Sequence, residues 1–391
     1  MKIDFLTGSI HRPLPDSAVE RIQRWEIVPM FFASLVLTAI AFYLFPLSAK
    51  NPVDLYATIA KDPYRFRELP YGARLLTPFI VHYLPVGINE GFRIVAFVSF
   101  LFSGGLLYAM LRLAGTPPLL SLLLLPGFYF APTPRYIIAN SWYIDPMSYW
   151  LSLAVFCGLL TGNLGVTLAG TTLGALNRPE SLILFPVVAI AWWNKEYPIR
   201  SLFPSLLSAL PGSLIYLGIL YIWPAVSDLQ VMRNIHGSSI GTLPQNYSAI
   251  FKEHGFAILI SGQIYSEMMP YLWGPAFLGL FRVPRRIALL AVSHIFLSAL
   301  PLLMANDFFR LPFFAFPAIL LLAGVGLAYA AQVHPAFAAV VVVISGIHAV
   351  INPRLIWPGP AVGILLLMVY VVFRTSGTGP AGSTESQQSP P

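Results

Sequence analysis

Charged residues are scarce in this chain of 391 residues. They make up only 10% of the sequence, whereas hydrophobic residues make up 57%, and the mean hydropathy is +0.73. A water-soluble domain with so few charges could not cover its own surface, so the bilayer must act as the solvent of the chain. The composition therefore predicts an integral membrane protein.

Cysteine is almost absent as well. The single cysteine, Cys157, lies within an apolar run, which excludes internal disulfides and cysteine-based metal sites. The chain also lacks the alternating segments of about ten residues that the wall of a membrane β-barrel requires. Its formal net charge of +7 is dispersed among apolar runs, which favours contact with anionic lipid and predicts no binding of nucleic acid.

Long apolar runs dominate what is present. They cover residues 28–48, 92–114, 119–132, 145–160, 164–176, 181–193, 202–223, 269–281, 287–305, 309–331, 335–351 and 357–373. A spanning helix needs about 20 apolar residues, and several runs are shorter than that. We expect an all-α membrane protein, a polytopic bundle of roughly twelve transmembrane helices, with an uncertainty of about two.

The division of the chain follows from these runs. We expect a cytoplasmic segment at 1–27, a transmembrane domain at 28–373, and a disordered cytoplasmic tail at 374–391 that is rich in Ser, Gly, Pro and Gln. Two interruptions, about 49–91 and 224–268, would be outer loops. Arg112, Arg282, Arg285, Arg286 and the segment 194–200 then fall inside, as the positive-inside rule requires, whereas several basic residues of the first loop do not. The pattern predicts a multi-pass protein of the bacterial inner membrane with both termini in the cytoplasm.

The same topology gathers charges of both signs at the outer ends of the helices. These residues are Asp54, Asp62, Arg65, Arg67, Glu68, Arg74, Arg135, Asp145, Arg178, Glu180, Asp307 and Arg310. Charges at membrane depth are costly unless they are paired or line a watery cavity. The one-sided cluster therefore predicts an outward-facing polar cavity, and its arginines suit the oxygens of a phosphate group.

Simpler structural roles compete with this interpretation. Asp54 could cap a short helix at 54–60, while the arginines that follow it could bind lipid headgroups. Asp145 falls in the first turn of a helix, where the helix dipole favours a carboxylate. Arg178 and Glu180 stand at a helix break and could fasten helices as an ion pair. Arg310 lies one turn after Asp307 and could face the same cavity.

The order of these motifs resembles a known superfamily. The chain has an Asp in its first large outer loop, the stretch Pro-Tyr-Gly-Ala-Arg-Leu-Leu-Thr-Pro at 70–78, Arg-x-Glu at 178–180 and Asp-x-x-Arg at 307–310. Over roughly 28–331 it is similar to the GT-C superfamily, the multi-pass glycosyltransferases that use polyprenyl-phosphate-linked sugars. The motifs are short, so the resemblance is one of superfamily only.

This resemblance implies a reaction and a set of site residues. Asp54 would be the catalytic base, with Asp62 as the second candidate, and Arg74, Arg178 and Arg310 would hold the donor phosphate. The other charges of the outer cluster would line the cavity around them. The donor would be a polyprenyl-phosphate-linked sugar and the acceptor a hydroxyl of a lipid, glycan or protein, with inversion at the sugar and no metal or other cofactor required. Membrane lipids would be the remaining partners.

Two other classes use the same residues. A transporter or flippase for a lipid-linked or amphipathic anion would bind its cargo with the same arginines, although no internal repeat is evident in the sequence. A non-catalytic scaffold of a membrane assembly would carry these charges as ordinary helix ends. Removal of one carboxylate distinguishes the three classes of protein. Only an enzyme should lose its activity when that carboxylate is removed and still bind its ligand.

Overall fold

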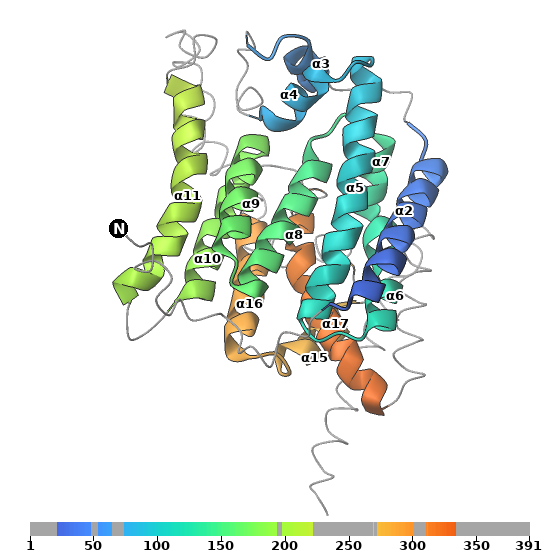
Figure 1. Ribbon diagram of the computed structural model, residues 1–391, viewed down its shortest axis with the longest axis vertical. Helices are drawn as coiled ribbons and strands as arrows, with labels where there is room; N and C mark the ends of the chain where they lie inside the picture. The colour runs from blue at the N-terminus through green and yellow to red at the C-terminus, as the bar shows by residue number, and fades with distance from the viewer. Residues whose placement is uncertain are drawn as a thin grey trace, which may run out of the picture.

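The structure is a computed structural model that describes residues 22–47, 54–64, 74–193, 198–221, 269, 272–300, 310 and 312–333 (Figure 1). All regular elements in these ranges are helices, and no strand occurs among them. The first half contains η1 (Arg24–Glu26), α2 (Ile27–Leu44), α3 (Asp54–Lys61), α4 (Leu76–Tyr83), α5 (Ile88–Leu113), α6 (Pro118–Tyr129) and α7 (Pro132–Ala139).

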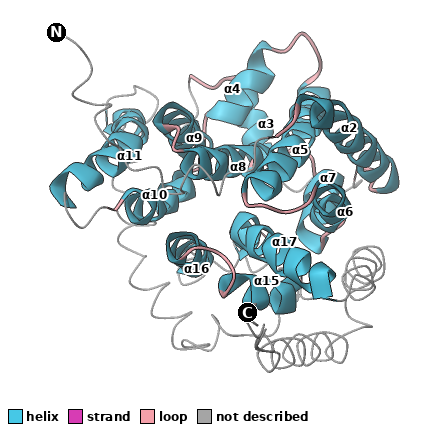
Figure 2. Cartoon of the chain, turned by 60° about the horizontal axis from the view of Figure 1, so that its bottom comes forward, coloured by secondary structure: helices cyan, strands magenta, loops and turns pink. Residues whose placement is uncertain are grey.

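The second half continues the bundle. It contains α8 (Asp145–Thr161), α9 (Leu164–Asn177), η3 (Pro179–Ile183), α10 (Leu184–Trp192), α11 (Pro198–Tyr221), α15 (Trp273–Leu280), α16 (Arg285–Ala299), η8 (Pro312–Ala315) and α17 (Phe316–Val333). Helix α8 lies between α5 and α9, and α15 lies beside α17, as Figure 2 shows from below.

Three helices are long and apolar enough to cross a membrane. By length and composition these are Arg24–Leu44, Ile88–Leu113 and Phe313–Gln332. Shorter apolar helices occupy Pro118–Tyr129, Ser181–Trp192 and Leu202–Ile215. The helical, apolar character predicted from the sequence is therefore confirmed for the described residues. The predicted runs 335–351 and 357–373, the loop 224–268 and the tail 374–391 lie outside them.

The element boundaries have local causes. Helix α8 begins with Asp145 and Pro146, a carboxylate and a proline in the first turn, and ends before Gly162, which adopts a left-handed conformation with φ of 68°. Asn163 then caps α9, because its side chain accepts a hydrogen bond from the backbone N–H of Val166. A two-residue turn thus joins two antiparallel helices.

The break after α9 places a charge at the helix end. Arg178 is extended, with φ of −155° and ψ of 114°, because the residue before a proline is disfavoured in the helical conformation. Pro179 then starts η3. The predicted helix break at this point is confirmed.

Two predicted runs differ from the helices that form. The run 119–132 gives α6 and a separate short helix, α7, whose first residue is Pro132. The described part of the run 309–331 forms η8, which begins at Pro312, and α17, which begins at Phe316, whereas the helix start expected near Asp307 lies outside the described residues. Proline stands at the first position of both α7 and η8, because it lacks an N–H and is best tolerated in the first turn of a helix.

An aromatic core joins α5, α6, α8 and the η8–α17 segment. The rings of Phe128 and Phe316 are 5.0 Å apart, those of Phe313 and Phe316 5.1 Å, and those of Tyr149 and Phe313 5.3 Å. All of these side chains are buried. Aromatic pairs at these distances add stabilisation beyond the area that they bury, so the core fixes η8 against the start of α8.

The bundle has two chemically different ends. At the end that we call the Asp145 end, uppermost in Figure 1, α8 begins, α9 ends and α3 and α4 lie across the helices. At the opposite end, the Arg112 end, α5 ends, α6 begins, and α16 starts with Arg285 and Arg286. Loops from opposite ends must emerge on opposite sides of a membrane that the long helices cross.

We predict that exposed positions at the two ends label from opposite sides. In a Cys157→Ser background, Lys61→Cys at the Asp145 end should react with a membrane-impermeant thiol reagent added outside intact cells. Arg285→Cys at the Arg112 end should react only after permeabilisation. Both native side chains are exposed. Labelling of both positions from the same side would contradict the arrangement of the helices across the membrane.

Candidate functional site

A buried carboxylate forms the centre of the Asp145 end. Asp145 is 0% exposed and accepts hydrogen bonds from two arginines: Nη1 of Arg178 donates to Oδ1, and Nη1 of Arg310 donates to Oδ2 across 3.2 Å. The side chain of Arg178 is 2% exposed and that of Arg310 18%. One carboxylate therefore joins the end of α9 to the residue just before η8.

Each of the two guanidinium groups also lies over an aromatic ring. The Cζ atom of Arg178 is 4.9 Å from the ring centroid of Phe314, and that of Arg310 is 4.3 Å from the ring of Tyr143. Such contacts stabilise a cation more strongly where water is excluded. The planes of the two arginines are thus fixed by a carboxylate on one side and a ring on another, which orients their remaining N–H groups.

A third arginine links the first outer segment to this cluster. Arg74 is buried and donates from Nη1 to the hydroxyl of Tyr56 across 2.8 Å, and its charge acts on the Asp145 carboxylate. Burial raises the pKa of Tyr56, and the nearby charge of Arg74 opposes that shift. Because Tyr56 belongs to α3, this contact holds the short helix that begins at Asp54 over the cluster.

Asn177 fastens the surrounding backbone. Its side-chain oxygen accepts from the hydroxyl of Thr77 at 2.6 Å and from the backbone N–H of Thr77 at 3.3 Å. Its NH₂ group donates to the carbonyl of Ile144 at 2.9 Å and to the hydroxyl of Ser148 at 2.7 Å. All of these atoms are buried, so the side chain holds α4, α8 and α9 together directly beside Arg178.

Only some of the predicted site residues lie in the cluster. The structure brings together Arg74, Asp145, Arg178 and Arg310, as a one-sided cluster requires. Asp62 is exposed at the end of α3, and Arg135 lies over the ring of Phe45, 5.0 Å from its centroid. The side chains of Asp54 and Glu180, and the residues Arg65, Arg67, Glu68 and Asp307, lie outside the described part of the structure.

Both Arg178 and Arg310 pair with Asp145, a contact that the sequence did not indicate. The neighbours considered in the sequence were Glu180 for Arg178 and Asp307 for Arg310. The Glu180 side chain and Asp307 lie outside the described part of the structure, so those two pairings stay predictions. Asp145 does lie in the first turn of α8, and its contact with Arg178 joins that turn to the end of α9. Tyr56, Tyr143, Asn177 and Phe314 were not singled out, because nothing in their local pattern marks them.

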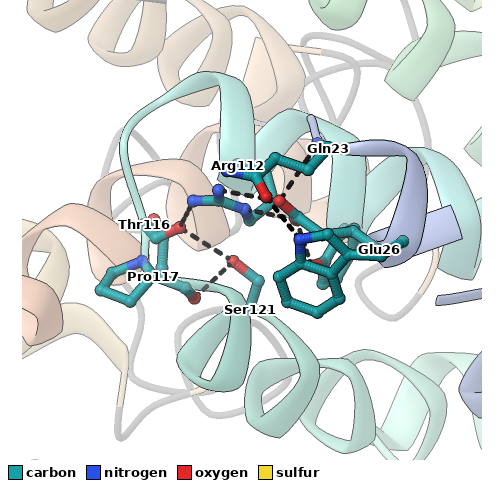
Figure 3. Close-up of polar contacts among 8 residues, drawn as sticks. Gln23, Glu26, Arg112, Thr116, Pro117 and Ser121 are labelled. Atoms are coloured by element: carbon teal, nitrogen blue, oxygen red, sulfur yellow. Dashed lines mark hydrogen bonds and ion pairs between the residues drawn. The ribbon is translucent and has the colours of Figure 1, made fainter. Parts of the chain in front are cut away.

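A second buried ion pair lies at the Arg112 end (Figure 3). The Glu26 carboxylate accepts from Nε of Arg112 at 2.7 Å and from the hydroxyl of Tyr108 at 2.6 Å, while Nη1 of Arg112 donates to the carbonyl of Thr116 at 2.7 Å. The hydroxyl of Ser121 donates to the carbonyl of Thr116 at 3.3 Å. This network ties the start of α2 to the α5–α6 turn.

The two clusters differ in chemical capacity. The pair at the Arg112 end balances one carboxylate with one guanidinium and lies between helix ends, so a structural role accounts for it. Among the described side chains, the cluster at the Asp145 end sets three guanidinium groups around one carboxylate, and one of them, Arg310, is partly exposed. Oriented guanidinium groups are suited to bidentate recognition of phosphate. In the described part of the chain, no group of three His, Cys, Asp or Glu side chains could hold a metal ion.

Comparisons with known proteins give no further indication. No protein-family model matches this chain, and neither curated proteins nor solved structures yield a match.

We predict that both buried carboxylates are needed for stability. Asp145→Asn and Glu26→Gln each remove the charge of a buried carboxylate that pairs with a buried guanidinium, and breaking such a pair typically costs about 3 to 5 kcal/mol. Thermal unfolding of the purified protein in detergent should show a clear loss of melting temperature for both variants. An unchanged melting temperature in Asp145→Asn would mean that the carboxylate is not the partner of the two arginines.

Proposed function

We propose that the protein is a membrane glycosyltransferase that moves a sugar from a polyprenyl-phosphate-linked donor to an acceptor hydroxyl at the Asp145 end of the bundle. The observation that carries the proposal is the meeting of Arg74, Arg178 and Arg310 around Asp145. These arginines come from three segments that are more than 100 residues apart. The resemblance to the GT-C superfamily assigns to these three positions the binding of the donor phosphate.

Arg178 and Arg310 differ in exposure, which supports a different role for each. Arg178 is held between Asp145 and the ring of Phe314 and is almost inaccessible, so it supplies fixed positive charge. Arg310 is more exposed, with 18% of its side chain accessible against 2% for Arg178, so we assign it the direct contact with a phosphate oxygen. Positive groups that are oriented before the ligand arrives stabilise developing negative charge without reorganisation.

The proposed reaction is a displacement at the anomeric carbon of the sugar. The Asp54 carboxylate takes the proton of the acceptor hydroxyl while the hydroxyl oxygen forms its bond to that carbon. The bond between the carbon and the phosphate oxygen breaks on the opposite face, and the polyprenyl phosphate leaves with the electron pair. The configuration is inverted, and the arginines stabilise the leaving phosphate. The link from Arg74 to α3 supports placing Asp54 near this site.

The membrane arrangement belongs to the same proposal. We place the Asp145 end on the outer face of a bacterial inner membrane, with roughly twelve spans and both chain termini in the cytoplasm. The cluster at the Asp145 end would then open to the outside, where lipid-linked sugars serve as donors because nucleotide sugars are absent. Support comes from the opposite end of the bundle, where α5 ends with Arg112 in its last turn and α16 begins with Arg285 and Arg286, as expected for the cytoplasmic side.

We predict that Arg310→Lys weakens donor binding. Lysine keeps the charge but cannot reproduce the planar fork of the guanidinium group. Binding of a fluorescent polyprenyl phosphate to the purified protein should weaken by roughly tenfold, the equivalent of about 1.4 kcal/mol. Arg282→Lys is the matched control, because Arg282 also lies over a ring, that of Tyr329 at 3.7 Å, but at the Arg112 end.

The pattern of results separates the three classes of function. Equal affinity in wild type, Arg310→Lys and Arg282→Lys would refute the assignment of Arg310. Binding without any transfer to an acceptor, together with movement of the labelled lipid between leaflets, would favour a flippase. No binding by the wild-type protein would favour a scaffold.

We predict separately that Asp54 is the base. Asp54→Asn keeps the shape of the side chain but removes its basicity, so transfer should fall by about 10²-fold or more, while donor binding and melting temperature stay close to wild type. Asp62→Asn is the control, since Asp62 is exposed. Transfer lost only in Asp62→Asn would move the role to Asp62. Normal transfer in both variants would contradict the mechanism.

A further inference from the structure

A buried histidine lies one contact beyond the charged cluster. His294, on α16, is buried, and the edge-to-face contact of its ring with Phe156 has a centroid distance of 4.8 Å. Its Nε2 atom is 2.8 Å from the carbonyl oxygen of Phe314. A carbonyl oxygen only accepts, so Nε2 must carry the proton and donate it. The Nδ1 atom of His294 has no hydrogen-bond partner among the described residues.

The acceptor of this bond belongs to a residue that touches the cluster. Phe314 is in η8, and its ring lies under the guanidinium group of Arg178, which in turn donates to Asp145. Arg310 lies four residues before Phe314 in the chain. The placement of η8 therefore determines the position of the Phe314 ring under Arg178. It also affects the position of Arg310, which lies shortly before η8 in the chain.

We infer that His294 is a positioning residue of the phosphate site, which acts on Arg178 through the backbone carbonyl and ring of Phe314. The inference rests on the proposed function, because the ligand of Arg178 and Arg310 is taken to be the donor phosphate. It adds a residue that neither the sequence motifs nor the charged cluster itself identifies.

The competing explanation is a histidine that only fills the core. Histidine is a poor filler at this position, because burial of an unpartnered ring nitrogen costs free energy that a phenylalanine or leucine would not. The hydrogen bond to η8 is the feature that an apolar residue cannot supply. A filler should therefore tolerate replacement by an apolar residue, whereas a positioning residue should tolerate only another donor.

The hydrogen bond can be tested without any ligand. In protein labelled with ¹⁵N-histidine, His294 should be a neutral ring with its proton on Nε2, identified by the signal that disappears in His294→Gln. A proton on Nδ1 would overturn the inference, since Nε2 could then not donate to Phe314. This measurement decides the point in the wild-type protein even if an apolar variant does not fold.

The link to the phosphate site is tested by binding of polyprenyl phosphate. His294→Phe removes the donor and should weaken binding by roughly 2- to 30-fold, the range that loss of an oriented cation–π contact produces. His294→Gln keeps an N–H donor and should restore most of the affinity. Leu290→Ala is the matched control, because Leu290 is buried one turn earlier on α16 and makes no hydrogen bond to η8.

The outcomes separate this inference from the proposed function. Absence of binding by the wild-type protein would refute the proposed function and the role of His294 in it. Binding by the wild type with equal affinity in His294→Phe would refute the role of His294 alone. Equal weakening in His294→Phe, His294→Gln and Leu290→Ala would show a structural role only.

Discussion

The constraint on which this structure depends is one carboxylate that is buried beside guanidinium groups at the end of an apolar helix bundle. Asp145 cannot stay charged in such surroundings without partners, because removing a charge from water costs several kcal/mol. Arg178 and Arg310 supply those partners. The reverse also holds, because Asp145 supplies each of these arginines with a counter-charge at that depth.

Several features of the fold follow from that requirement. Arg178 reaches Asp145 because Pro179 ends α9 one residue later, and Asn177 holds this break against α4 and α8. Arg310 reaches it because η8 packs through Phe313 into the aromatic core. At the opposite end, Glu26 and Arg112 anchor α2 to α5, so the cluster has a rigid frame beneath it. The proposed recognition of phosphate by fixed charges would need such a frame.

The sequence predicted the helical bundle well, because apolar runs and prolines act locally. It also placed Asp145, Arg178, Arg310 and Arg74 at one end, since counting helices fixes the side on which each end lies. It did not indicate that Asp145 pairs with Arg178, because the two residues are 33 positions apart and no local pattern links them. The roles of Tyr56, Asn177, Phe314 and Glu26 depend on contacts between distant helices, which no local pattern encodes.

The most direct test is mass spectrometry of the lipids that co-purify with the protein. Wild-type protein extracted gently from its membrane should carry a polyprenyl phosphate or its glycosylated form, and Arg310→Lys should carry much less of it at equal protein recovery. Ordinary phospholipids should remain equally abundant in both samples. A wild-type preparation that holds only ordinary phospholipids, or an Arg310→Lys preparation that retains the same polyprenyl phosphate, would contradict the assignment of the buried cluster as a phosphate site.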